Sequence, residues 1–147
     1  MFQGYTSTVI NAPIETVWDQ IKDFNGLSEW HPMIQSSRIE EGYANGAVGC
    51  IRELTLKDSE ERVREQLLGY SNKEYSIVYN IVESDMPVFD YISTMRLRPV
   101  VDGNITFFEW SVAFEIDPGH DGKEQTDFFI SSVYQSGFDS LKKRFEI

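Results

Sequence analysis

Cysteine is almost missing from this chain, which has 147 residues and a single Cys50. One thiol cannot form an internal disulfide bond, and it cannot build a metal cluster that needs several thiolates. The chain also has no apolar run of about 18 residues, and its start, MFQGYTSTVI, lacks the basic region and apolar run of a secretion signal. We therefore expect a cytoplasmic protein without integral membrane association.

Positive charge is scarce as well. The sequence has 13 Lys and Arg against 24 Asp and Glu, a formal net charge of −11. Such a protein repels polyanions, which argues against binding of nucleic acid and against docking on an anionic membrane. The sequence has no glycine-rich phosphate loop, no zinc-binding histidine pair and no nucleophile elbow. We expect neither a metal nor a cofactor.

Hydrophobic residues are plentiful by contrast. They make up 41% of the chain, charged residues make up 25%, and 14% of the residues are aromatic. These values are ordinary for a globular protein, and a chain of this length buries about two thirds of its surface on folding. No linker or repeat divides the sequence, so we expect one domain over residues 1–147, with enough aromatic side chains for a large core or an apolar pocket.

The hydrophobic pattern predicts an α+β fold. It indicates a strand over residues 3–10, a helix over 13–21 with Pro in its first turn, and a short second helix over 26–30. Between residues 34 and 117 it is typical of about six strands joined by short turns, among them 48–56, 61–68, 75–82, 91–97 and 105–116. An apolar stripe over about 124–145 predicts a long helix, which would fill the concave face of a curled antiparallel sheet.

Alternation along the strands decides which side chains face inward. It places large apolar side chains of the last strand on the inner face: Phe108, Trp110, Val112 and Phe114. By the same rule Arg52 and Glu65 point inward from neighbouring strands. Because a buried charge is tolerated when it is paired, we predict an Arg52–Glu65 ion pair. That pair is either a structural element or the polar anchor of a pocket.

Several short motifs, taken in order, resemble a known family. They are INAPIETVW at 10–18, Trp30-His31-Pro32, VGCIREL at 48–54 with Glu65 as its partner, then Tyr79, Trp110 and the pair Gly137 and Leu141. Over nearly the whole chain they resemble the START/Bet v 1-like superfamily, and within it the bacterial polyketide cyclase/dehydrase-like group (SRPBCC proteins). The resemblance implies a helix-grip fold: a curved seven-stranded antiparallel sheet around a long C-terminal helix, with two short helices after the first strand. It also implies a deep cavity for a hydrophobic or amphipathic small molecule.

More distantly, the chain resembles the plant abscisic acid receptors. Their carboxylate-binding lysine matches His31, so the resemblance does not imply hormone binding. Their pocket glutamate, tyrosine and serine match Glu65, Tyr91 and Ser93. Their gate loop is shortened to residues 57–59, which argues against a phosphatase-docking surface, and residues 84–90 could still form a lid.

These arguments together predict one ligand site between sheet and helix. Its expected residues are His31, Arg52, Glu65, Tyr79, Tyr91, Ser93, Trp110, Phe129, Val133 and Gly137. His31 could be a hydrogen-bonded structural residue, a ligand contact or a general acid/base, and Glu65 could act as a base if burial raises its pKa. Gly137 either serves helix packing or leaves room for a ligand, and the inner aromatic side chains could instead fill the core.

Three functions follow from this reasoning. The first is binding of a small hydrophobic or amphipathic molecule in the internal cavity. The second is a polyketide cyclase, aromatase or dehydrase that uses His31 or Glu65 for proton transfer. The third is a protein-interaction module that uses the outer face of the sheet.

Overall fold

The computed structural model describes residues 1–146. Strand β1 (Phe2–Ile10) is followed by helix α1 (Ile14–Ile21), the 3-10 turn η1 (Phe24–Gly26) and helix α2 (Leu27–Trp30). Six strands come next: β2 (Ile34–Ile39), β3 (Ile51–Leu56), β4 (Arg62–Ser71), β5 (Ser76–Glu83), β6 (Val88–Val100) and β7 (Ile105–Ile116). The chain ends in one long helix of three consecutive segments, α3 (Gly122–Asp127), η2 (Phe128–Tyr134) and α4 (Gln135–Arg144).

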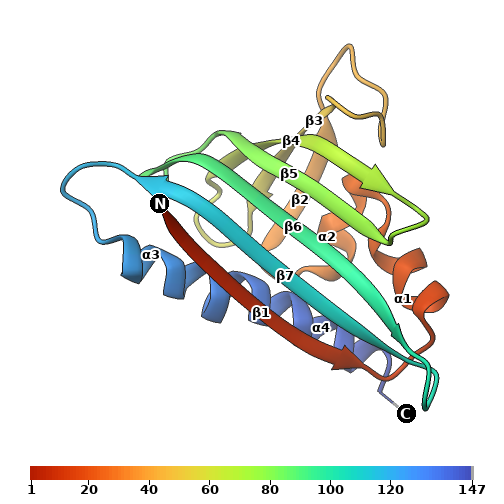
Figure 1. The fold of residues 1–147 in the computed structure, drawn as a ribbon. Coiled ribbons are helices and arrows are strands. Elements are labelled where there is room, and N and C mark those ends of the chain that lie inside the picture. The colour runs from red at the N-terminus through yellow and green to blue at the C-terminus, as the bar shows by residue number, and fades with distance from the viewer. Residues whose placement is uncertain (147) are drawn as a thin grey trace.

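The seven strands form one antiparallel sheet in the order β1-β7-β6-β5-β4-β3-β2. Helices α1 and α2 carry the chain from one edge strand to the other. Strands β2 to β7 then return across the sheet by hairpins until β7 pairs with β1. The sheet is curved and the long helix lies along its concave side, as Figure 1 shows. The predicted α+β helix-grip architecture is confirmed.

The long helix changes its winding in the middle. We expected an unbroken α-helix over about 124–145, but residues 128–134 form a π-helix. Its hydrogen bonds run from residue i to i+5 instead of i+4. The buried side chains Phe129 and Tyr134 are five residues apart, a spacing that places two side chains on one face of a π-helix but not of an α-helix. Burial of both rings under the same sheet therefore accounts for the wider winding.

Two strand boundaries also differ from the prediction. The strand predicted over 48–56 begins only at Ile51, because the backbone turns at Gly49, whose φ is 99°. That angle lies in the left-handed region that favours glycine. The predicted loop over 84–90 ends earlier than expected, since β6 starts at Val88.

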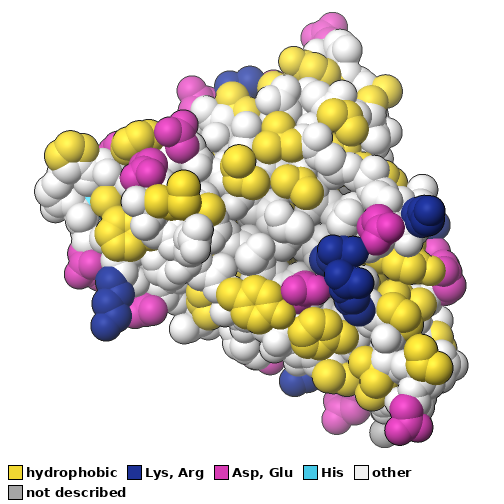
Figure 2. Space-filling view, in the orientation of Figure 1, with side chains coloured by type: hydrophobic (Ala, Val, Ile, Leu, Met, Phe, Trp, Pro, Cys, Tyr) yellow, Lys and Arg dark blue, Asp and Glu magenta, His cyan; other side chains and the backbone are white. Residues whose placement is uncertain are grey.

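The two faces of the sheet carry different side chains. The four apolar residues predicted on the inner face of β7 are all buried. The outer face exposes single large apolar side chains such as Tyr5 and Ile92. Figure 2 looks onto this face, where apolar patches alternate with acidic and basic side chains. The core therefore lies between the concave face and the long helix. None of the helices described within residues 1–146 is long and apolar enough to cross a membrane.

Candidate functional site

A cavity of about 130 Å³ lies between the concave face of the sheet and segment η2 of the long helix. Aliphatic side chains of β2 to β5 form much of its wall, among them Ile34, Leu54, Val63 and Ile81. Seven of the ten predicted site residues also line it: His31, Glu65, Tyr79, Tyr91, Trp110, Phe129 and Val133. The sheet and the helix thus bring most of the predicted residues to one place.

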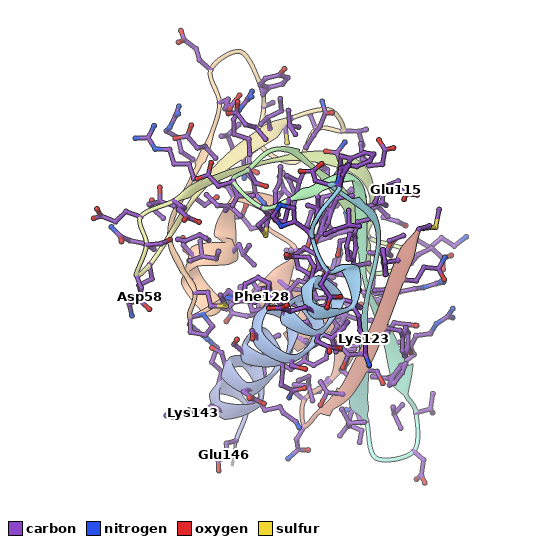
Figure 3. The ribbon with its side chains drawn as sticks, turned by 90° about the vertical axis from the view of Figure 1, so that its left-hand side faces the viewer. Asp58, Glu115, Lys123, Phe128, Lys143 and Glu146 are labelled. Carbon is purple, nitrogen blue, oxygen red and sulfur yellow. The ribbon has the colours of Figure 1, made fainter. Side chains whose placement is uncertain are left out.

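The cavity meets the surface beside the start of η2. Phe128, which is 40% exposed, and the side chains of Met86 and Glu61 line this end. Figure 3 looks toward it and shows Phe128 on the helix, facing the β3–β4 turn that carries Asp58. Met86 belongs to the segment 84–90, which the sequence analysis named as a possible lid. We call these three residues, Glu61, Met86 and Phe128, the mouth of the cavity.

Two predicted residues lie behind the wall instead of in it. Ser93 is fully buried, and the Tyr134 hydroxyl lies 3.0 Å from its Oγ on the side of the helix. A Cβ added at Gly137 would lie 3.0 Å from the His31 ring and 3.1 Å from the Trp110 ring. These distances favour the packing alternative for Gly137, because a side chain there would push against both rings.

Arg52 is the third predicted residue behind the wall, and it forms the predicted ion pair. Its Nε and Nη2 donate to Glu65 Oε1 over 3.0 and 2.7 Å, and its Nη1 donates to the Phe24 carbonyl over 2.6 Å. Arg52 and Glu65 face each other across β3 and β4 and are only 3% and 7% exposed. The guanidinium also lies 4.0 Å from the centre of the Phe24 ring. Arg52 therefore fixes the position of the Glu65 carboxylate through two hydrogen bonds from the side away from the cavity.

Glu65 lines the cavity, and only one of its two carboxylate oxygens is engaged by Arg52. Arg52 engages only Oε1, and among the described residues no group donates a hydrogen bond to Oε2. Burial raises the pKa of the Glu65 carboxyl, and the adjacent Arg52 charge opposes that rise. An unpartnered acceptor in an apolar wall favours a ligand group that donates a hydrogen bond.

A chain of hydroxyl groups runs behind the cavity. Ser93 Oγ donates to the Ser111 carbonyl over 2.9 Å, so its single proton is used. The Tyr134 hydroxyl, 3.0 Å away, must then donate to Ser93, and the Tyr91 hydroxyl must donate to Tyr134 over 2.8 Å. Burial raises the pKa of both tyrosines well above its usual value, so both stay protonated.

Trp110 connects this chain to Tyr79. Its indole N–H lies 3.0 Å from Ser93 Oγ and 3.2 Å from the Tyr79 hydroxyl oxygen. The indole also stacks on the Tyr134 ring with centroids 4.3 Å apart. Burial raises the pKa of Tyr79 to about 12. The aromatic wall is therefore a hydrogen-bonded unit whose hydroxyl groups remain neutral.

Both nitrogens of His31 are engaged with the backbone. The Met33 N–H donates to Nδ1 over 3.1 Å, so the ring proton sits on Nε2, which donates to the Val133 carbonyl over 2.7 Å. The side chain is 2% exposed, and burial lowers its pKa to about 4. His31 is therefore a neutral ring that ties the end of α2 to η2 and offers the cavity its carbon edge.

Sequence reasoning missed Tyr134, which bridges Tyr91 and Ser93. A signal was present, because a tyrosine on the apolar stripe of a buried helix needs a partner for its hydroxyl. It also missed Phe128 at the mouth, and it gave Met86 only as part of the possible lid over 84–90. Within the described part of the chain, no three His, Cys, Asp or Glu side chains are placed to hold a metal ion.

Comparison with known proteins gives a consistent result. Residues 1–146 match the family described as "Polyketide cyclase / dehydrase and lipid transport". The solved structure of the protein XoxI from Bacillus cereus is 30% identical, with a TM-score of 0.88 over 99% of this chain and 96% of that one. A protein from Nitrosospira multiformis is 30% identical, with a TM-score of 0.84 over 98% and 96% of the two chains. An uncharacterised protein from Bacillus thuringiensis is 29% identical, with a TM-score of 0.86 over 98% of each chain. With the fold and the family match in agreement, the chain belongs to the polyketide cyclase / dehydrase and lipid transport family.

Proposed function

We propose that the protein binds a small, mainly apolar molecule in the cavity between the sheet and segment η2. The observation that carries this proposal is the cavity of about 130 Å³, which has an apolar wall and a mouth at the surface. Small-molecule sites are typically built in this way, with a few polar groups that set the orientation of the ligand. Here Glu65, Tyr79 and Tyr91 are among the polar side chains at the wall.

The size of the cavity limits the part of the ligand that it encloses. A dry apolar cavity of about 150 Å³ holds a benzene ring, whereas sites for drug-sized ligands measure about 300–1,000 Å³. One aromatic ring, or the end of a longer apolar molecule that extends through the mouth, therefore matches the space. Phe128 and Met86 are the side chains that such an extension would displace.

The function is tested by titrating benzene into the protein and following the Trp110 indole N–H by NMR. We expect a shift of this signal that saturates with benzene, and a rise in Tm. Two neighbouring residues of β5 provide a matched pair of variants, since Ile81 lines the cavity and Val82 is exposed. Ile81→Trp should abolish binding by filling the space, and Val82→Trp should keep it. Binding that survives in Ile81→Trp, or no binding to the unaltered protein, would contradict the proposal.

A second function, proton transfer of the cyclase or dehydrase type, is favoured by the state of Glu65. Its carboxyl faces the cavity with one unpartnered oxygen and with a pKa raised by burial, as a general acid or base requires. Because both nitrogens of His31 are occupied, Glu65 is the better candidate of the two. Glu65→Gln should then abolish turnover of a poly-β-keto substrate while the substrate still binds. Unchanged turnover in Glu65→Gln would exclude this role.

A further inference from the structure

We propose that the cavity selects a neutral ligand with one hydroxyl group, such as a phenol or an alcohol, and rejects carboxylates. This inference rests on the proposed function, because it names the class of molecule that the cavity takes. It follows from counting the hydrogen-bond donors and acceptors at the wall, and from the charges around the mouth.

The wall offers acceptors that the protein does not use. Glu65 Oε2 receives no hydrogen bond from any described residue, although the side chain is more than nine-tenths buried. The Tyr91 hydroxyl donates its proton to Tyr134. Only its lone pairs remain for a ligand in the cavity. A ligand O–H can therefore donate to these acceptors without displacing a hydrogen bond of the protein.

The wall also offers one donor. The Tyr79 oxygen accepts from the Trp110 indole, and among the described residues no group accepts the Tyr79 proton within hydrogen-bond distance. Ser93 Oγ already has three hydrogen-bond partners: the Ser111 carbonyl, the Tyr134 hydroxyl and the Trp110 N–H, the last of which it shares with Tyr79. The Tyr79 O–H is therefore left for the contents of the cavity.

A hydroxyl group is the smallest neutral ligand group that satisfies both demands, because it donates one hydrogen bond and accepts others. It can donate to Glu65 while it accepts from Tyr79. A carboxylate would only accept, and it would meet the charge of Glu65. An ammonium group would only donate, and Arg52 already balances the carboxylate that would have to offset its charge.

Arg52 cannot serve as the anchor of an anionic ligand. The guanidinium uses Nε and Nη2 on Glu65 and Nη1 on the Phe24 carbonyl, and it lies behind the cavity wall. The resemblance to the abscisic acid receptors therefore does not extend to carboxylate binding, in line with the replacement of their lysine at His31.

The surface outside the mouth points the same way. Glu61, Met86 and Phe128 also border an open groove, whose wall carries the carboxylates Glu61, Asp85, Asp121 and Glu124. His120 is the one nitrogen base among the described residues of that wall. The wall contains no Lys or Arg among these residues. With a net charge of −11 on the whole chain, this approach repels anions.

The test compares four probes that share one benzene ring: phenol, benzene, benzoate and benzylamine, each titrated at pH 7 with the Trp110 indole N–H as the signal. We expect phenol to bind about tenfold more tightly than benzene, and benzoate to bind more weakly than both. Ile81→Trp, whose cavity is filled, reports binding at any other place.

Tyr79→Phe removes the hydroxyl donor without disturbing the fold, because Trp110 keeps its hydrogen bond to Ser93 in this variant. We expect the advantage of phenol over benzene to fall to about threefold or less while the affinity for benzene stays the same. Tyr70→Phe is the control, since that hydroxyl lies near Asn72 and away from the cavity.

The possible results lead to different conclusions. Equal affinities for phenol and benzene would overturn the hydroxyl proposal and leave the proposed function standing. Tighter binding of benzoate or benzylamine than of phenol would overturn it as well, and so would a phenol advantage that survives in Tyr79→Phe. Failure of all four probes to bind would overturn the proposed function itself.

Discussion

The space under the sheet has two halves that are built differently, although the same strands cover both. In the half under α4, the Phe138 and Phe108 rings pack with centroids 4.9 Å apart, and Leu141 is fully buried. In the half under η2, a cavity of about 130 Å³ remains between Phe129, Val133 and the sheet. The comparison shows that the cavity lies beside the π-helical segment, whereas the rings beside the α-helical segment are closely packed.

The boundary between the halves is held by polar contacts. His31 bonds the Val133 carbonyl in η2, and Ser140 Oγ in α4 donates to the Trp30 carbonyl over 2.6 Å. Tyr134, the last residue of η2, bonds to Ser93 of the sheet. These contacts stabilise the helix on both sides of the change in winding, so the cavity does not close by a shift of the helix.

The largest expected difference between the two halves is in the free energy of unfolding after a side chain is truncated. Phe138→Ala removes a ring from close packing and should lower the free energy of unfolding by about 3–5 kcal/mol. Val133→Ala removes two methyl groups beside existing space and should lower it by about 1 kcal/mol or less. Urea unfolding of both variants checks this difference. Equal losses would show that the two halves are equally well packed.

Breaking the Arg52–Glu65 ion pair should lower the free energy of unfolding almost as strongly. Arg52→Ala leaves the Glu65 carboxyl buried without its partner and should cost about 3–5 kcal/mol of unfolding free energy. Arg38→Ala is the matched control, since it removes an exposed partner of Glu53 and should cost about 1 kcal/mol or less.

The double variant Arg52→Met/Glu65→Leu sharpens this test. It replaces the pair by apolar groups of similar size, so it should recover most of the stability that Arg52→Ala loses. A loss below about 1 kcal/mol in Arg52→Ala would mean that Glu65 is not confined as the structure places it.

The sequence was sufficient to predict the sheet, the long helix and the Arg52–Glu65 pair, because all three follow from short-range periodicity. Alternation put the two charged side chains on the inner face of adjacent strands, and only one pairing satisfies both there. Seven of the ten predicted site residues line the cavity, and several of them, His31, Glu65 and Tyr91 among them, were predicted from the family resemblance as well.

The remaining features depend on how the helix is seated on the sheet. Ser93 faces inward as alternation predicts, yet the Tyr134 side chain covers it, and strand periodicity carries no information about that contact. The occupancy of both His31 nitrogens depends on the Val133 carbonyl, 102 residues away in the chain. Counting aromatic residues likewise cannot separate a filled half from a hollow one.

His31 makes the boundary sensitive to pH. The ring has a pKa of about 4 when folded, against an ordinary value of 6.5, so the unfolded chain takes up a proton that the folded chain refuses between these values. Stability from this group is complete above pH 6.5 and falls as the pH drops toward 4, by about 3 kcal/mol in total. Unfolding free energies measured from pH 7 to 4 should therefore fall less steeply in His31→Gln.

Comparison with the variant is needed because carboxyl groups titrate in the same range and cancel between the two proteins. His120→Gln, in an exposed loop, should keep the profile of the unaltered protein. Parallel profiles for His31→Gln and the unaltered protein would mean that folding does not lower the pKa of His31.

The smallest effect concerns the hydroxyl of Tyr134 at the boundary itself. Tyr134→Phe keeps the ring stacked on Trp110 but removes the acceptor of the Tyr91 proton and the donor to Ser93. The free energy of unfolding should fall by about 1–2 kcal/mol. Tyr70→Phe, which removes a hydroxyl near the surface, should lower it by less. Amide hydrogen exchange would locate the effect, with faster exchange in Phe128–Tyr134 than in Gln135–Arg144 if the hydroxyl chain holds the π-helical segment. Exchange that rises equally in both segments would mean that packing alone maintains the change in winding, and that the hydroxyl chain only satisfies its own polar groups.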